Sequence, residues 1–208
     1  MLARVGAIAL VALACACGPS HPATPFNGVD VTGSSIGSSF RLRDAQGRER
    51  SLADYRGKVV VVAFGYTHCP DVCPMTLANL ANARRKLGKA GDEVQVLFVS
   101  VDPKRDTPDL LARYVTAFDP TFVGLGGTPA DVQRTVKDFR LYVEERPTGN
   151  GDYSVDHSAQ IFAYDRKGNL RLVISQTAAP EAIASGAAVC GITSLRFPLR
   201  SYAKICAE

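Results

Sequence analysis

Two cysteines, Cys69 and Cys73, stand in the run GYTHCPDVCP at 65–74, directly after the apolar stretch 59–64. The apolar stretch is typical of a buried strand, and Pro70 suits the first position of a helix. Cysteines four residues apart lie on one helical face with Cβ atoms roughly 5–6 Å apart, so both sulfurs can bind one soft metal ion. A disulfide needs Cβ atoms at about 3.5–4.5 Å and would unwind this first turn somewhat. The spacing favours a dithiolate metal site that can also oxidise.

Metal binding is not the only role that two such cysteines can have. They could form a structural disulfide or a redox-active pair, although redox pairs of the C-x-x-C type have two intervening residues and this chain has three. Peroxidases built on a related fold place a threonine three residues before the reactive cysteine, whereas Thr67 lies two residues before Cys69. A helix N-terminus should lower the pKa of Cys69, which suits a metal ligand and a nucleophile equally.

The elements that must position these thiols alternate between strand and helix before the chain turns to strands alone. We expect strands at 38–43, 58–64 and 94–101, helices at 70–87, 107–118 and 128–139, and strands at 141–143, 158–164 and 170–174. Alternation of this kind predicts a parallel sheet, and the final hairpin extends it with antiparallel strands.

Three stretches resemble the SCO/SenC family of copper chaperones: GYTHCPDVCPMTL at 65–77, VSVDPKRDTPDLL at 99–111 and VDHSAQIFAYD at 155–165. The resemblance implies an α/β, thioredoxin-like fold. Its central mixed β-sheet would be flanked by helices, with an N-terminal strand or hairpin extension and a family-specific insertion. It also implies copper, as Cu(I) or Cu(II), bound by Cys69, Cys73 and His157.

His157 follows a turn-rich loop at 149–152, and we expect it to open a strand that faces the cysteine helix. An isolated histidine at a strand edge is usually a polar surface residue. Only two other histidines occur, His21 in a presumed linker and His68 beside Cys69. Two thiolates and one imidazole make a trigonal set suited to Cu(I), and an added ligand would accommodate Cu(II).

Several neighbours have open roles. Asp156 could orient His157, Asp71 could act in the motif or on a partner, and both could equally be solvated acids. His68 would lie near the metal or contact a partner, and Met75 is expected in core packing. The block at 102–108 caps the next helix, so we expect it to be structural.

The ends of the chain differ in composition from its centre. Residues 1–17 resemble a secretory leader with a lipid-acceptor cysteine, Cys17 or Cys15, and 18–37 are expected to form a flexible tether rich in Pro, Gly, Ser and Thr. The copper-binding domain is expected at 38–180. Residues 181–208 form an atypical tail that a frameshift or lineage variation could explain, and the roles of its Cys190 and Cys206 stay open. We expect truncation after about Ala188 to cost little stability.

The chain carries a formal net charge of +4 with 46% hydrophobic residues and no basic run interleaved with aromatics, so nucleic-acid binding is not indicated. The resemblance implies delivery of copper to the CuA site of cytochrome c oxidase, with a copper donor and a thiol reductant as further partners. The chain would be exported and anchored at the periplasmic face of a bacterial membrane. The alternative is a thiol-disulfide oxidoreductase whose redox pair is Cys69 and Cys73. Whether the chain is an enzyme is left open.

Overall fold

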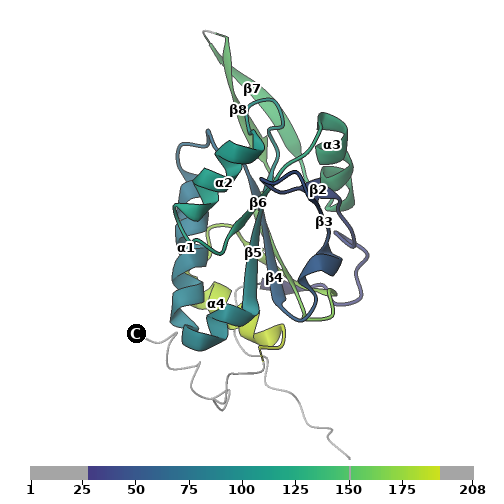
Figure 1. The fold of residues 1–208 in the computed structure, drawn as a ribbon, viewed down its shortest axis with the longest axis vertical. Helices are drawn as coiled ribbons and strands as arrows, with labels where there is room; N and C mark the ends of the chain where they lie inside the picture. Colours follow the sequence, from purple (N-terminus) through teal and green to yellow (C-terminus); the bar gives the residue numbers. More distant parts are fainter. Residues whose placement is uncertain (1–27, 150, 193–208) are drawn as a thin grey trace, which may run out of the picture.

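The computed structural model describes residues 28–149 and 151–192, which are built around one mixed six-stranded sheet (Figure 1). The strand order is β1-β10-β9-β4-β5-β6. In chain order the six strands are β1 (Gly28–Asp30), β4 (Val59–Gly65), β5 (Val94–Ser100), β6 (Val123–Leu125), β9 (Gln160–Tyr164) and β10 (Leu170–Ser175). Strands β4, β5 and β6 run parallel, while β9 and β10 are antiparallel to their neighbours. The predicted mixed sheet is confirmed.

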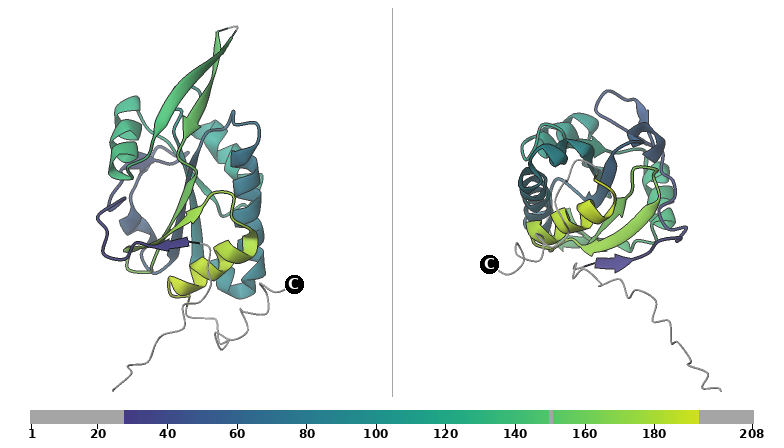
Figure 2. Two further views of the ribbon diagram at one scale, coloured as in Figure 1. Left: turned by 180° about the vertical axis from the view of Figure 1, so that it is seen from behind. Right: turned by 90° about the horizontal axis from the view of Figure 1, so that it is seen from below.

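Strand β4 is buried along its whole length because helices cover both faces of the sheet. The four helices are α1 (Val72–Lys86), α2 (Pro108–Thr116), α3 (Pro129–Asp138) and α4 (Pro180–Val189). Figures 1 and 2 show α1, α2 and α4 on one face and α3 on the other. Phe64 of β4 meets Phe139, at the end of α3, with ring centroids 4.7 Å apart. Side chains alternate along a strand, so Gly65 faces α1 instead.

Local sequence explains where α2 and α3 begin. Thr107 and Thr128 each accept a hydrogen bond from a backbone N–H of the helix that follows, and a proline occupies the first turn of each helix. These caps satisfy N–H groups that the helix leaves unpaired. Both helices therefore start within one residue of the predicted position.

Two hairpins lie outside the main sheet. The small hairpin of β2 (Leu42–Arg43) and β3 (Glu49–Arg50) precedes the short 3-10 helix η1 (Leu52–Tyr55) and forms the N-terminal extension. A second 3-10 helix, η2 (Gly88–Glu93), links α1 to β5. The longer hairpin of β7 (Val143–Gly149) and β8 (Asp152–His157) projects from the body of the molecule (Figure 1).

The structure corrects several sequence predictions. Of the expected strand at 141–143 only Val143 lies in a strand, as the first residue of the long β7, and His157 ends β8 instead of opening the next strand. The strand β6 was not predicted, because VGL is too short to show a pattern. Residues 28–30, within the expected tether, pair with β10 and belong to the sheet.

Helix α4 lies inside the segment expected to be an atypical tail. It packs beside α1 (Figure 2) and buries Ile183, Ala184 and Ala187, and the chain beyond it still buries Cys190 and Ile192. Cys190 and Ile192 thus contribute apolar surface to the core, which goes against the reasoning that a chain truncated after about Ala188 loses little stability.

The leader with Cys15 and Cys17, most of the tether, and the tail beyond residue 192 with Cys206 lie outside the described residues. No helix in the described part of the chain has the length and apolar character that crossing a bilayer requires.

Candidate metal centre

The two cysteines lie where β4 gives way to α1, at the carboxyl end of the parallel strands. Cys73, in the first turn of α1, is buried, and its Sγ lies over Gly65 at the end of β4. A Cβ built on Gly65 would come within 2.6 Å of that sulfur. Gly65 therefore makes room for the Cys73 thiol at this position.

Cys69 lies before the helix and not on its first turn. Helix α1 begins at Val72, since Pro70 disfavours a helical backbone at the residue before it. The thiols nevertheless meet, because the backbone N–H of Cys73 donates to Cys69 Sγ at 3.4 Å. Both cysteines are free in this structure. A reversible disulfide between them stays a prediction.

The two thiols share one proton unequally. The Cys73 thiol donates a hydrogen bond to Cys69, and this lowers the pKa of Cys69 to about 5, against the effect of its partial burial. Backbone N–H groups of Asp71 and Cys73 add to the lowering. The pKa of Cys73 is raised, because it holds the proton that Cys69 accepts and because it is buried. The pair at neutral pH is a Cys69 thiolate beside a Cys73 thiol.

Alkylation of the copper-free protein should report this thiolate. Below its pKa Cys69 is a thiol and above it a thiolate, so its rate of reaction with iodoacetamide should rise with a midpoint near pH 5, against about 8.5 for an ordinary cysteine. Removing the donor in Cys73→Ala should move the midpoint upward. Cys190→Ala should leave the profile unchanged, since burial raises the pKa of Cys190 to about 12. A midpoint above pH 8 in the parent protein would contradict the shared proton.

His157 is the third predicted ligand, and the end of β8 brings it to the cysteines. Its Nε2 lies 3.9 Å from Cys73 Sγ, and its Nδ1 lies 3.1 Å from the carbonyl oxygen of Ser158. A carbonyl oxygen only accepts, so Nδ1 carries the proton and the Nε2 lone pair is directed toward the thiol. The sequence left open whether Asp156 orients this ring, and the Ser158 carbonyl has that position.

Cys73 is the central member of the three predicted ligands, since it contacts both Cys69 and His157. Within residues 28–149 and 151–192, however, no three His, Cys, Asp or Glu side chains already form a metal-binding cluster. The structure thus places Cys73 in contact with each of the other two residues.

The remaining candidates are exposed. Asp156 pairs with Arg146 at 3.2 Å, and Asp71 precedes α1 without capping it through its side chain. Met75, expected in the core, is 40% exposed. His68 is exposed, with its Nδ1 3.1 Å from Thr67 Oγ1.

Sequence reasoning did not identify three residues that surround this centre, Asp106, Arg105 and Tyr153. Asp106 is buried and contacts the loop that carries Cys69, while Arg105 and Tyr153 contact each other beside the hairpin that carries His157. The stretch 102–108 was noted as a motif, but its contacts are with distant residues and leave no local pattern.

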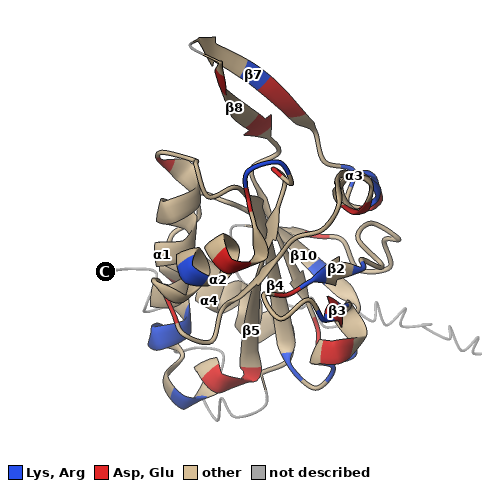
Figure 3. Cartoon of the chain, turned by 45° about the horizontal axis from the view of Figure 1, so that its top comes forward, with Lys and Arg blue, Asp and Glu red and all other residues tan. Residues whose placement is uncertain are grey.

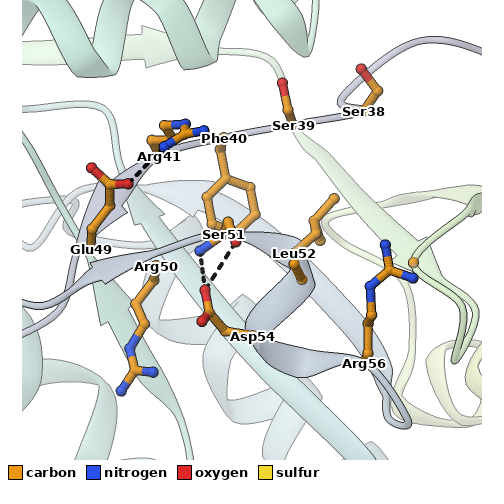
Figure 4. Close-up of a pocket in the computed structure, with 12 residues that line it drawn as sticks. Ser38, Ser39, Phe40, Arg41, Glu49, Arg50, Ser51, Leu52, Asp54 and Arg56 are labelled. Atoms are coloured by element: carbon orange, nitrogen blue, oxygen red, sulfur yellow. Dashed lines mark hydrogen bonds and ion pairs between the residues drawn. The ribbon is translucent and has the colours of Figure 1, made fainter.

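A pocket elsewhere on the surface shows no comparable chemistry. Figure 4 shows it between η1 and the segment 38–41. Most of its charged groups are already paired: Arg41 binds Glu49 at 3.0 Å, Arg50 binds Asp44 at 2.8 Å, and Asp54 accepts hydrogen bonds from Ser51. None of the predicted ligands lines this pocket.

Comparisons with known proteins repeatedly find one family. The SCO1/SenC family model matches residues 30–189. Protein SenC of Rhodobacter capsulatus is 34% identical over 171 residues, which cover 82% of this chain and 77% of SenC. The mitochondrial SCO2 homologue of Danio rerio is 42% identical over 132 residues, covering 62% of this chain. The chain spans about half the length of the mitochondrial SCO2 relatives that it matches.

The solved structure of Bradyrhizobium japonicum ScoI with copper bound is similar to this one, with a TM-score of 0.68 and 39% identity. The match covers 74% of this chain and 98% of ScoI. The predicted thioredoxin-like fold is therefore confirmed. The family match over most of the chain leads to one conclusion: this chain belongs to the SCO1/SenC family.

Proposed function

We propose that this protein is a copper chaperone that binds one copper ion through Cys69, Cys73 and His157. The observation that carries the proposal is that Cys73 contacts both other residues. Its backbone nitrogen lies 3.4 Å from Cys69 Sγ, and its Sγ lies 3.9 Å from His157 Nε2. Two thiolates suit Cu(I), and an added imidazole suits Cu(II) as well. The similarity to a ScoI solved with copper bound supports copper over zinc as the cargo.

The chemistry of the thiols favours exchange of the metal with a partner. Cys69 is partly exposed and already a thiolate, so it can take up or release copper without first losing a proton. Cys73 must release its proton when copper binds, because it is a thiol in the copper-free state. Copper would move by stepwise replacement of these ligands with the thiolates of an acceptor.

The acceptor we propose is the subunit of cytochrome c oxidase that carries the CuA site. The protein would work on the outer face of a bacterial membrane, held there by a lipid on Cys17 or Cys15 and supplied by a periplasmic copper donor. The apolar leader at 1–17 and the family membership support this placement.

A second candidate function, reduction of the acceptor's cysteines, is favoured by the unequal pKa values of the pair. The Cys69 thiolate would attack the acceptor disulfide and form a mixed disulfide, releasing one acceptor thiolate. The Cys73 sulfur would then lose its proton and attack Cys69, releasing the second thiolate and leaving a Cys69–Cys73 disulfide. Two electrons pass to the acceptor, and an external thiol reductant must restore the pair.

A transfer assay separates the two functions. The copper-loaded protein is mixed with a copper-free CuA domain whose cysteines are either reduced or oxidised, and CuA absorption and acceptor thiols are followed. Chaperone function predicts CuA formation with the reduced acceptor, faster than from a copper–glutathione complex and absent with Cys73→Ser. Reduction of the oxidised acceptor with no copper transfer to the reduced one would favour the alternative and overturn the chaperone proposal.

A further inference from the structure

The turn at 102–106, between β5 and α2, contacts both segments that carry the predicted ligands. The turn is closed by hydrogen bonds from the Asp106 N–H to the Asp102 carbonyl and from the Asp102 N–H to Ser100 Oγ, each 3.0 Å long. It follows β5, the strand beside β4 at the carboxyl edge of the sheet. This turn therefore lies next to the metal centre although it supplies no ligand.

One end of the turn holds the loop before Cys69. The buried carboxylate of Asp106 accepts a hydrogen bond from Thr67 Oγ1 at 2.6 Å and from the Thr67 backbone N–H at 3.2 Å. It also accepts one from Ser100 Oγ at 2.6 Å. Burial raises the pKa of Asp106, partly offset by these donors. Thr67 is two residues from Cys69, so these bonds fix the path of the cysteine loop.

The other end of the turn holds the hairpin that carries His157. The hydroxyl of Tyr153 donates to Asp102 Oδ1 at 2.8 Å, and Arg105 Nη1 donates to the Tyr153 carbonyl at 2.8 Å and to Asp152 at 2.9 Å. The Arg105 guanidinium also stacks 3.7 Å from the centre of the Tyr153 ring and bonds Asp102 at 2.6 Å. Tyr153 lies four residues before His157 on β8.

The hairpin depends on such contacts for its position. Strands β7 and β8 pair with each other and form a sheet separate from the six-stranded one (Figure 3). A two-stranded hairpin is marginally stable by itself in water. The aromatic ring of Tyr66, which meets His157 edge-on with centroids 6.3 Å apart, also lies 5.7 Å from the Arg105 guanidinium. Arg105 thus contacts both the hairpin and the ring next to the histidine.

We propose that Arg105 and Tyr153 are positioning residues that set the distance between His157 and the two cysteines. Cys69 and Cys73 come from one continuous segment, whereas His157 reaches them from a separate hairpin. Loosening the hairpin should therefore weaken the three-ligand binding of Cu(II) and leave two-thiolate binding of Cu(I) nearly intact. This inference rests on the proposed copper-binding function.

The test compares Arg105→Met and Tyr153→Phe with Lys104→Met. Lys104 is the adjacent residue of the turn and also reaches the hairpin, through an ion pair with Glu145 and with its Nζ 5.6 Å from the centre of the Tyr153 ring. Its side chain is exposed, so both contacts contribute little. Loss of groups that orient a ligand typically lowers metal affinity about 10–100-fold. We expect a rise of that size in the Cu(II) dissociation constant for Arg105→Met, a smaller rise for Tyr153→Phe, and parental values for Lys104→Met. The Cu(I) dissociation constant should change less than about threefold throughout, since both thiolates remain.

A copper-free measurement keeps this test separate from the proposed function. In the parent and in Lys104→Met, nuclear Overhauser contacts should link the Tyr66 and His157 rings, and in Arg105→Met they should weaken or vanish. If the parent binds no copper, the proposed function fails while the ring contacts still report on positioning. Unchanged ring contacts and unchanged Cu(II) affinity in both Arg105→Met and Tyr153→Phe would overturn the inference. Equal loss of Cu(I) and Cu(II) affinity with a lowered melting temperature would also overturn it, because it would show a general structural role.

Discussion

Replacing His157 with Ala is expected to remove the thiolate-to-Cu(II) absorption of the copper-loaded protein while Cu(I) stays bound. The imidazole Nε2 lies 3.9 Å from Cys73 Sγ with its lone pair available, so its loss leaves two sulfur ligands. Cu(I) is satisfied by soft thiolates, whereas Cu(II) prefers nitrogen among its ligands. Removing a residue that only hydrogen-bonds to a metal ligand typically lowers metal affinity about 10–100-fold. Removing the ligand itself should cost more, so we expect Cu(II) affinity to fall more than about 100-fold.

Removing a thiol should have a different effect. Cys73→Ser takes away the central residue, which contacts both other ligands, and should abolish tight binding of both copper oxidation states. The measurement is anaerobic titration against a Cu(I) chelator, together with absorption spectra of the Cu(II) form. His68→Ala is the matched control, since His68 neighbours Cys69 but is exposed. Its Nδ1 contacts Thr67 Oγ1 at 3.1 Å and lies only at the 4.0 Å limit of an ion pair with Asp106. A parental Cu(II) spectrum in His157→Ala would show that the three-ligand site is wrong.

The residues around Cys69 could be predicted because their signals are local. The apolar run VVVVAF at 59–64 specifies a buried strand. The C-x-x-x-C spacing correctly brings the two cysteines together, although Cys69 precedes the helix and does not share a helical face with Cys73. The position of His157 came from the resemblance. The prediction that His157 opens a strand was wrong, because the hairpin of β7 and β8 is mostly exposed. Its sequence therefore lacks the apolar alternation that marks a half-buried strand.

The contacts of Arg105 and Tyr153 could not be predicted, for a different physical reason. They join residues 48 positions apart, and stacking of a guanidinium on a ring has no signature in either local segment. Asp106 looked like a helix-capping residue in the sequence. Its burial and its bonds to Thr67 and Ser100 follow from the adjacency of β4 and β5, which only the assembled sheet supplies.

Helix α4 was missed because its composition hides its role. The sequence PEAIASGAAV is apolar nearly all round, so it lacks the stripe of a surface helix. Gly186 lies against Ile174, where an added Cβ would come within 2.8 Å of the Ile174 Cδ1 atom. The small residues of α4 thus allow it to pack closely on β10 and α1. A helix of this kind does not show the apolar stripe and opposite charged face by which a surface helix is predicted.

Ile183→Ala should lower the melting temperature of the copper-free protein substantially. Ile183 is 2% exposed and packs with Leu80, Ala83 and Leu87 of the α1 region. An Ile→Ala change in a core costs about 2–5 kcal/mol through lost burial and the cavity that remains. For a domain of this size each kcal/mol lowers the melting temperature by about 2–4 °C, so we expect a fall of about 5–15 °C.

Val189→Ala on the same helix is the matched control, because Val189 is 39% exposed and should cost less than about 1 kcal/mol. A chain ending after Ala179 should be destabilised more than Ile183→Ala, since it also loses the buried Ala184, Ala187 and Cys190. A chain ending after Ile192 keeps every one of these contacts and should melt at a higher temperature than the chain ending after Ala179. Equal melting temperatures for Ile183→Ala, Val189→Ala and the parent would mean that α4 contributes nothing to the core, and the expected tail boundary at 181 would then stand.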